Sequence, residues 1–252
     1  MVKVFLILMF LVILFGAPKF GGPKRGVVLT IPSGPSQAER YTESVDELVE
    51  RYYRERDFEK ALTYEDSALR DMEYGSMDTD TICRLNAMLG GCYVGLGECE
   101  KGKPYIDTAL KEYEEAGETG GSAYIVRHIE GIYNLKTGEY GMALDCFEEA
   151  LRQAGALESP DRGVELEVDI AGICCDMGRA YMELGDIDSA LEMLGKSYGI
   201  AGSLRLESEV AYDYYEDVLE PVIKECFEKI SGTSDEEMGY DEWFSAQFGE
   251  QV

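Results

Sequence analysis

One stretch of this chain decides the fold: residues 178–197 read GRAYMELGDIDSALEMLGKS. The small residue Gly178 is followed by Tyr181, then by the turn Gly185-Asp186, and then by Ala190 at helical spacing. Small residues at a helix crossing let the two axes approach closely, and bulky residues fill the volume beside the crossing. A glycine in such a turn ends the first helix with a left-handed cap. The stretch therefore predicts two helices that pack as an antiparallel pair.

The pattern occurs three more times upstream. One copy has Gly131, Asn134, Gly138, Glu139, Tyr140, Ala143, Phe147 and Ala150; another has Gly90, Tyr93, Gly97, Glu98, Gly102, Ile106 and Ala109; a degraded copy has Leu48, Tyr52, Asp57, Phe58, Ala61, Ala68 and Leu69. Counted from Val49, Gly90, Gly131 and Gly178, the periods are 41, 41 and 47 residues. Because one helix pair cannot bury its own apolar face, this self-similarity predicts a stacked helical array.

The core of this pattern resembles the tetratricopeptide repeat. Leu89-Gly90 with Tyr93, Gly97 and Ala109 carries that core, and so do Met177-Gly178, Tyr181, Gly185 and Ala190. The resemblance covers residues 42–200 and implies an all-α fold, a right-handed α-solenoid of stacked antiparallel helix pairs. We expect four such pairs over residues 41–203.

The sequence departs from the usual repeat in three ways. The periods exceed 34 residues, the first copy lacks its glycines, and the terminal proline is absent or displaced. The long period is similar to the subgroup with lengthened helices, seen in kinesin light chains and in bacterial peptide-sensing regulators.

Residues 4–15 form an uninterrupted apolar run ahead of a Gly- and Pro-rich linker, residues 18–40. Twelve residues match a signal-peptide core and are short for a membrane span, which needs about 20 residues. Residues 1–17 are interpreted as a membrane anchor with a cytoplasmic domain, or as a signal cleaved after Ala17 from a secreted protein. A buried strand or a misassigned start is the third interpretation. Lys19, Lys24 and Arg25 favour a cytoplasmic location for the downstream side of an anchor.

Seven cysteines, an odd number without the spacing of a disulfide framework, favour a reducing compartment. Cys174 and Cys175 are neighbours on a predicted helix, so they point about 100° apart and cannot both face one ion. With a single histidine, His128, the sequence predicts no metal site, and we expect no cofactor.

The formal net charge is −27, from 50 acidic and 23 basic residues. Such a chain repels phosphate, so nucleic acid is excluded as a partner. A protein or peptide with basic and apolar character is the natural counterpart. The alternative is that the acidic surface only confers solubility.

The resemblance implies that the first helices of the pairs line a concave face where peptides bind. The residues that we project onto this face as binding candidates are Arg84, Met88, Ile125, His128, Ile129, Ile132, Lys136, Arg179 and Met182. In the third pair an aliphatic stripe lies where solvent is expected. Either it receives an apolar ligand, or the C-terminal segment covers it, or the projected register is wrong. Asp46 and Glu50 stand where chaperone-binding members of the family carry a Lys and Asn carboxylate clamp, which disfavours an acidic ligand.

Residues 204–230 are predicted to form a capping helix that Pro221 bends or divides. Its expected apolar stripe comprises Leu206, Val210, Tyr214, Val218, Val222, Cys226 and Ile230. Residues 231–252 are acidic and aperiodic, which predicts a disordered tail. Within the tail, the aromatic residues of 239–244 indicate a docking peptide or a segment that folds back onto its own domain.

No nucleophile elbow, phosphate-binding loop or metal motif is present in the sequence, so we expect a protein that is not an enzyme. Two function classes remain. The first is a protein-binding scaffold or adaptor. If it is attached to a membrane, the attachment is through residues 4–17. The second is a regulatory switch in which a peptide in the concave face alters contacts with an effector protein. The oligomeric state is left open.

Overall fold

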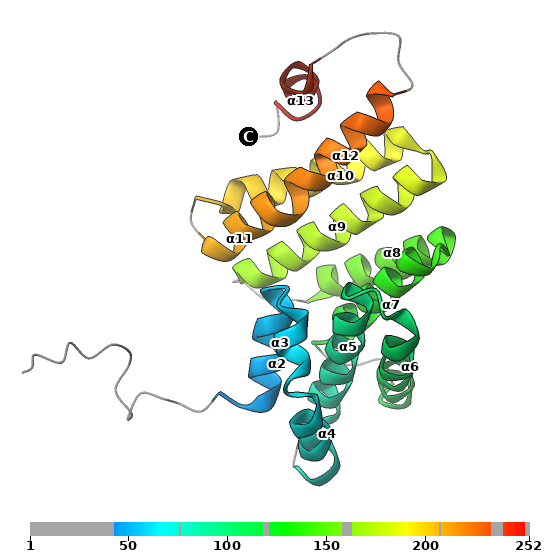
Figure 1. Ribbon diagram of the computed structural model, residues 1–252, viewed down its shortest axis with the longest axis vertical. Coiled ribbons are helices and arrows are strands. Elements are labelled where there is room, and N and C mark those ends of the chain that lie inside the picture. The colour runs from blue at the N-terminus through cyan, green and yellow to red at the C-terminus, as the bar shows by residue number, and fades with distance from the viewer. Residues whose placement is uncertain are drawn as a thin grey trace, which may run out of the picture. The chain divides into compact units, whose positions relative to one another are not determined.

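The computed structural model describes residues 43–75, 77–117, 121–157, 163–206, 208–232 and 239–249. Within these ranges every regular element is a helix (Figure 1). The expected signal or anchor (residues 1–17) and the linker (residues 18–40) lie outside the described residues.

Three complete helix pairs follow one another along the chain. They are α5 (Thr79–Gly95) with α6 (Cys99–Glu115), α7 (Ala123–Thr137) with α8 (Tyr140–Ala156), and α9 (Val164–Leu184) with α10 (Ile187–Leu204). The two helices of each pair contact each other most extensively, and each pair also packs on the next through α5 with α7 and α8 with α9. The prediction of an all-α solenoid is confirmed. Its right-handed sense stays a prediction.

The degraded first copy also forms a pair, but its second helix is broken. α2 (Val45–Arg54) is followed by α3 (Phe58–Leu62) and α4 (Glu65–Tyr74). The break lies at Thr63 and Tyr64, whose backbone N–H groups bond three residues back, to Lys60 and Ala61. Ala61 and Ala68 are both fully buried, so small side chains keep their place at the interface without the glycines.

The helix crossings require small residues. A Cβ on Gly102 would lie 2.5 Å from the carbonyl oxygen of Gly90, where α6 crosses α5. A Cβ on Gly131 would lie 2.4 Å from the ring of Phe147, which is itself fully buried. The turn glycines Gly138 and Gly185 have φ angles of 86° and 77°, the left-handed cap that the repeat pattern predicts.

The capping region consists of α11 (Glu209–Tyr214), the π-helical turn η1 (Tyr215–Leu219) and α12 (Glu220–Ser231). The predicted stripe is wrong in its first half: Leu206 is 89% exposed and Val210 45%, whereas Ala211 and Leu219 are fully buried. The wider π turn, placed just before Pro221, changes the helical phase. Tyr214 still packs against the core, and the later members Val222 and Cys226 are buried in it.

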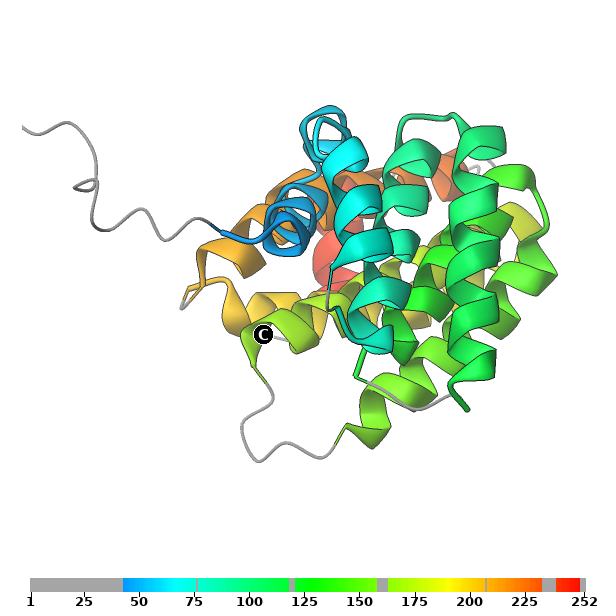
Figure 2. The same cartoon turned by 90° about the horizontal axis from the view of Figure 1, so that it is seen from below.

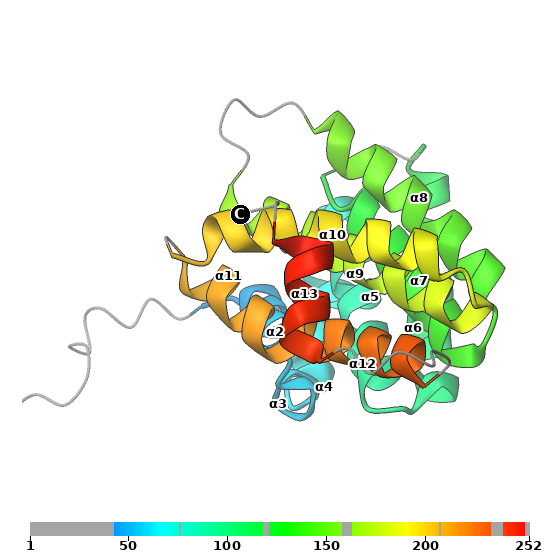
Figure 3. The ribbon, with the colours of Figure 1, turned by 90° about the horizontal axis from the view of Figure 1, so that it is seen from above.

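The expected disorder of residues 231–252 is wrong for residues 240–248. These residues form the helix α13 (Tyr240–Phe248), which lies across α10 and α12 (Figure 3). Trp243 and Phe248 are 6% and 1% exposed. Burial of these apolar side chains therefore orders a segment whose acidic composition predicted disorder.

All seven cysteines are free thiols, and Cys174 and Cys175 are 3% and 1% exposed. Both side chains thus pack in the protein interior. Among the helices of the described ranges, none combines the length and apolarity needed to cross a membrane.

The Gly102→Ala substitution should lower the free energy of unfolding by about 1–3 kcal/mol, because the new methyl group meets backbone that cannot move aside. The matched control is Gly141→Ala on the exposed face of α8, where a Cβ has no neighbour within 4 Å. The control should be neutral or stabilise by about 0.5–1 kcal/mol. Urea unfolding followed by circular dichroism measures both, and equal effects would contradict the close-crossing explanation.

Candidate functional site

The first helix pair folds over the face of α5 that was expected to be concave and open. A Cβ on Gly91 would lie 2.8 Å from the ring of Tyr53, and one on Gly95 would lie 2.4 Å from the ring of Phe58. The Tyr53 and Phe58 rings also contact each other, with centroids 5.9 Å apart. Side chains of the protein itself therefore fill this part of the concave face.

An ion pair joins the first helix pair to the fourth. Arg54 Nη1 at the end of α2 lies 2.6 Å from Asp169 Oδ1 in α9, and Asp169 also accepts a 2.8 Å hydrogen bond from the Tyr124 hydroxyl of α7. The end of α2 accordingly lies beside the N-terminal half of α9 (Figures 1 and 2). Repeats in a stacked array ordinarily contact only their neighbours. This array instead curves until its first and fourth pairs meet.

Charged side chains of alternating sign continue from this contact. Arg54 pairs with Glu50 at 3.2 Å, and Arg84 of α5 pairs with Glu50 and, at 3.6 Å, with Asp46. The side chains of these four residues are 20–25% exposed. A second group joins α7 to α9, where Asp176 pairs with His128 at 3.0 Å and with Arg179 at 2.8 Å. We call the two groups together the charged cluster: Asp46, Glu50, Arg54, Arg84, His128, Asp169, Asp176 and Arg179.

Burial acts against the charge of Asp176, whose side chain is 13% exposed, and by itself would raise the pKa of the carboxyl group. The hydrogen bond with His128 and the positive charge of Arg179 outweigh burial, so the pKa of Asp176 is lowered from its ordinary 3.8. Asp176 in turn raises the pKa of Arg179 against the effect of burial. The carboxylate is thus held in its charged form by groups from two helices.

The nine predicted site residues divide into four sets. Arg84, His128 and Arg179 belong to the charged cluster, and Lys136 is exposed at the end of α7. Ile132 is partly buried against the core. The remaining four are core residues with 1–9% exposure: Met88, Ile125, Ile129 and Met182. For these four the predicted location on an open surface is wrong.

The aliphatic stripe of α7 faces neighbouring helices. Ile125 and Ile129 belong to the same core cluster as Met88 of α5 and Ile173 of α9. The C-terminal region belongs to a different cluster, which includes Met182, Leu219 and Ile223. Of the three interpretations of the stripe, the structure supports a misplaced register, because the tight curvature turns these positions toward the next helix.

The sequence reasoning missed Asp169 and the pair Gly91 and Gly95. Nothing local marks Asp169 out among the acidic residues of the chain. The two glycines did carry a signal, since neither occupies a repeat position and they are spaced four residues apart on one helix face. Such unexplained small residues indicate that a large side chain approaches the helix, here Tyr53 and Phe58.

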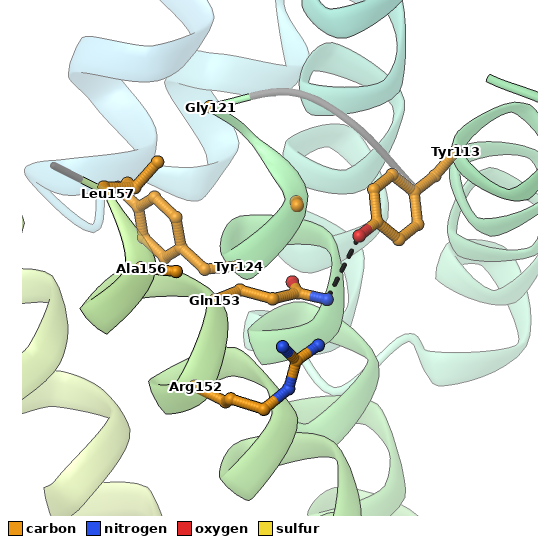
Figure 4. A pocket seen from close by; sticks show the side chains of 8 residues that line it. Tyr113, Gly121, Tyr124, Arg152, Gln153, Ala156 and Leu157 are labelled. Atoms are coloured by element: carbon orange, nitrogen blue, oxygen red, sulfur yellow. Dashed lines mark hydrogen bonds between the residues drawn. The ribbon is translucent and has the colours of Figure 1, made fainter. Parts of the chain in front are cut away.

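A separate small pocket opens between α6, α7 and α8. Its volume is about 220 Å³, and its lining includes Tyr124, Arg152 and Leu157 (Figure 4). Gln153 Nε2 donates a 3.0 Å hydrogen bond to the Tyr113 hydroxyl within it. The volume falls below the roughly 300–1,000 Å³ of typical small-molecule sites. It contains none of the predicted site residues, so the charged cluster is the better candidate.

Over the part of the chain that the structure describes, no group of three or more His, Cys, Asp or Glu side chains is placed to hold a metal ion. His128 and Asp176 form a pair in which each group serves as the other's partner. The charged cluster offers carboxylates and cationic side chains, which can bind charged and polar groups.

Comparison with known proteins bears on the repeat that contains Asp176 and Arg179. Residues 171–203, the greater part of the fourth pair, match the family model of the tetratricopeptide repeat. The chain carries a tetratricopeptide repeat. Such repeats are generally protein-interaction scaffolds and typically lack enzymatic activity. No curated protein matches the chain.

Three solved structures of repeat proteins are similar to the chain at low identity. BtubC (BKLC) from P. vanneervenii is 18% identical with a TM-score of 0.48, covering 77% of this chain and 82% of its own. The structure described as 'Podosopora anserina putative kinesin light chain nearly identical TPR-like repeats' is 14% identical with a TM-score of 0.45, covering 76% of this chain and 96% of its own. A variant of that protein with one substituted residue is 15% identical with a TM-score of 0.46, covering 75% of this chain and 94% of its own.

The Asp176→Asn substitution should lower the free energy of unfolding at pH 7 by about 1–3 kcal/mol, since it removes a charge that Arg179 and His128 depend on. Because the pKa of Asp176 is lowered by folding, its carboxylate stabilises the protein above the ordinary pKa of 3.8. This contribution to stability is lost as the pH falls below 3.8 and through the lowered pKa of Asp176 in the folded protein. The difference between wild type and variant should therefore be largest above about pH 4 and shrink below it. Urea unfolding across this range measures it, and a difference independent of pH would contradict the assignment.

Proposed function

We propose that this tetratricopeptide repeat protein is a non-enzymatic scaffold or adaptor that binds a basic, partly apolar segment of another protein at the charged cluster. The observation that carries the proposal is the ion pair between Arg54 and Asp169, which closes the array with exchangeable charges. Asp169, Asp176 and Glu50 are three carboxylates whose cationic partners come from the chain itself. Lysine or arginine side chains of a partner can take the place of those cations.

The energetics of the closing contact support exchange. Taking two charges partly out of water costs nearly as much as their attraction returns, so such a pair contributes little net stability. The Arg54 and Asp169 side chains are 25% and 20% exposed, which leaves them accessible to water and to a competing charge. A closure by apolar side chains would be harder for a ligand to replace. The apolar part of a ligand would contact Tyr53 and Phe58 once α2 separates from α9.

The same contact favours a second candidate function, a peptide-responsive switch. A ligand that replaces Arg54 at Asp169 separates the first helix pair from the fourth, which gives an open state of the array. The ligand stabilises this open state, relative to the closed state, by the difference in its affinity for the two. An effector that contacts both ends of the array would then distinguish the free from the bound form. The two functions share one binding site and differ in whether binding changes the contacts of a further protein.

We also propose that residues 4–17 attach the array to a membrane, with the array on the cytoplasmic side. Seven free thiols, most of them buried, support a reducing compartment. Cell fractionation with protease protection of the full chain tests this. Recovery of the array in the culture medium, without residues 1–17, would instead establish the secreted form.

Two substitutions at the closing ion pair should have opposite effects on ligand binding. Arg54→Ala and Asp169→Ala both break the contact between α2 and α9, but only Asp169→Ala removes the group that holds the ligand. With 12-residue peptides selected from a random library on the full chain, Arg54→Ala should bind several-fold tighter than wild type. Asp169→Ala should bind roughly tenfold weaker, because a charge-assisted hydrogen bond is lost. Fluorescence anisotropy of the labelled peptides measures both affinities.

Peptides with Glu in place of each Lys and Arg serve as the control for charge, and thermal unfolding of each variant serves as the control for folding. The proposal fails if the library yields no enriched basic peptides, or if the two substitutions change affinity in the same direction. For the switch, peptide binding should increase hydrogen exchange in α2. If peptide binding leaves hydrogen exchange in α2 unchanged, the switch is excluded and the scaffold function is retained.

A further inference from the structure

A second surface lies at the C-terminal end of the array, beneath α13. We call it the end face and define it by three rings: Tyr198 of α10, Tyr215 of η1 and Phe227 of α12. Tyr198 and Tyr215 contact each other with centroids 5.7 Å apart. The adjoining side chains Leu219, Val222, Ile223 and Cys226 are 0–2% exposed. The last pair of a solenoid exposes such a face unless something covers it.

Four rings of α13 cover the end face. Phe244 and Phe248 lie 5.4 and 5.6 Å from Tyr198, and Trp243 and Tyr240 lie 5.3 and 5.5 Å from Phe227, measured between ring centroids. Figure 3 shows α13 lying across α10 and α12 in this position. The rings recur at positions i, i+3, i+4 and i+8, the spacing by which an amphipathic helix docks its apolar face on a partner.

The contact consists of rings almost alone. Within the described ranges, no side-chain hydrogen bond or ion pair connects α13 to another helix, and the positive charge of Lys224 Nζ lies 5.9 Å from the centroid of the Tyr240 ring. The Tyr240 hydroxyl is buried without a hydrogen-bond partner, and burial raises the pKa of Tyr240 to about 12. A buried hydroxyl without a partner weakens an interface, here by roughly tenfold in affinity. The helix α13 therefore binds the end face less tightly than the same helix without this buried hydroxyl would.

We propose that the end face is a helix-docking site for a partner protein, and that α13 holds it covered until the partner displaces it. The partner helix carries aromatic side chains at the spacing of α13, a phenylalanine where α13 has Tyr240, and acidic residues in its first turn, as α13 has Asp241 and Glu242. Lys224, which pairs with Glu220 of its own helix at 2.7 Å, also places its positive charge 5.9 Å from the Tyr240 ring at the start of α13. A second copy of this chain is the less suitable occupant, because each copy has a net charge of −27 and the two repel each other. This site is separate from the charged cluster and does not depend on it.

The experiment uses the full chain and a labelled peptide that corresponds to residues 239–249 with Tyr240→Phe. In a cap-released chain, Phe244→Asp with Phe248→Asp, α13 can no longer cover the end face. Trp243 is the only tryptophan, so a red shift of its emission reports that α13 has been released. The cap-released chain should bind the peptide at least tenfold tighter than wild type, because α13 no longer competes for the site.

Three controls make the result specific. Tyr198→Ala in the cap-released chain should reduce peptide binding by tenfold or more, since it removes the ring that two phenylalanines contact. Tyr240→Phe in the otherwise unchanged full chain should strengthen its own cap and weaken peptide binding roughly tenfold. A peptide with Asp in place of both phenylalanines should not bind.

Circular dichroism and thermal unfolding establish that the array remains folded, and the milder Phe248→Ala chain should bind with intermediate affinity. The proposal is overturned if the released and wild-type chains bind the peptide equally, or if neither binds it. Dimers of the wild-type chain that accumulate with concentration in sedimentation would identify a second copy as the occupant and overturn the assignment to a partner protein.

Discussion

The approach of α5 and α6 at Gly90 and Gly102 leaves no room for even a methyl group, and this constraint sets the geometry of the whole array. The same crossing is made by Gly131 with the ring of Phe147, and by Gly178, where a Cβ would lie 2.8 Å from Leu194. Helices that cross this closely bring their neighbours close as well. The stacked pairs curve until the first pair meets the fourth, where Arg54 contacts Asp169, and the curvature decides what happens to the face they enclose.

In this chain the enclosed face is filled from within. The first pair inserts Tyr53 and Phe58 over the glycines of α5, and Arg54 reaches Asp169 three pairs further along. Charges rather than apolar groups make the final contact. Because partly exposed ion pairs contribute little net stability, this contact specifies one arrangement of the first and fourth pairs but stabilises it only weakly. That combination suits a surface that must be specific in its resting state and still open to a ligand.

The C-terminal end shows a different solution to an exposed face. The π turn before Pro221 rephases the capping region so that Leu219 and Ile223 face the core, and α13 then lies across the aromatic residues that remain. Here the contact is apolar, but it leaves the Tyr240 hydroxyl unsatisfied. The enclosed face and the C-terminal end of the array are thus each covered by a segment of the chain whose fit is incomplete, the first through exchangeable charge and the second through an unpaired hydroxyl.

The sequence by itself determined the helix pairs, the turns that join the two helices of a pair, and the small residues at their crossings, because these depend on contacts between residues close together in the chain. It also predicted Arg84, His128 and Arg179 as site residues, and the structure shows each of them in an ion pair. Only the tertiary structure decided that Met88, Ile125, Ile129 and Met182 are buried, since a small change in curvature turns a helix position from solvent to its neighbour. The pairing of Arg54 with Asp169 and the docking of α13 were beyond the sequence for the same reason. Both join segments far apart in the chain, and their existence depends on the summed curvature of every pair between them.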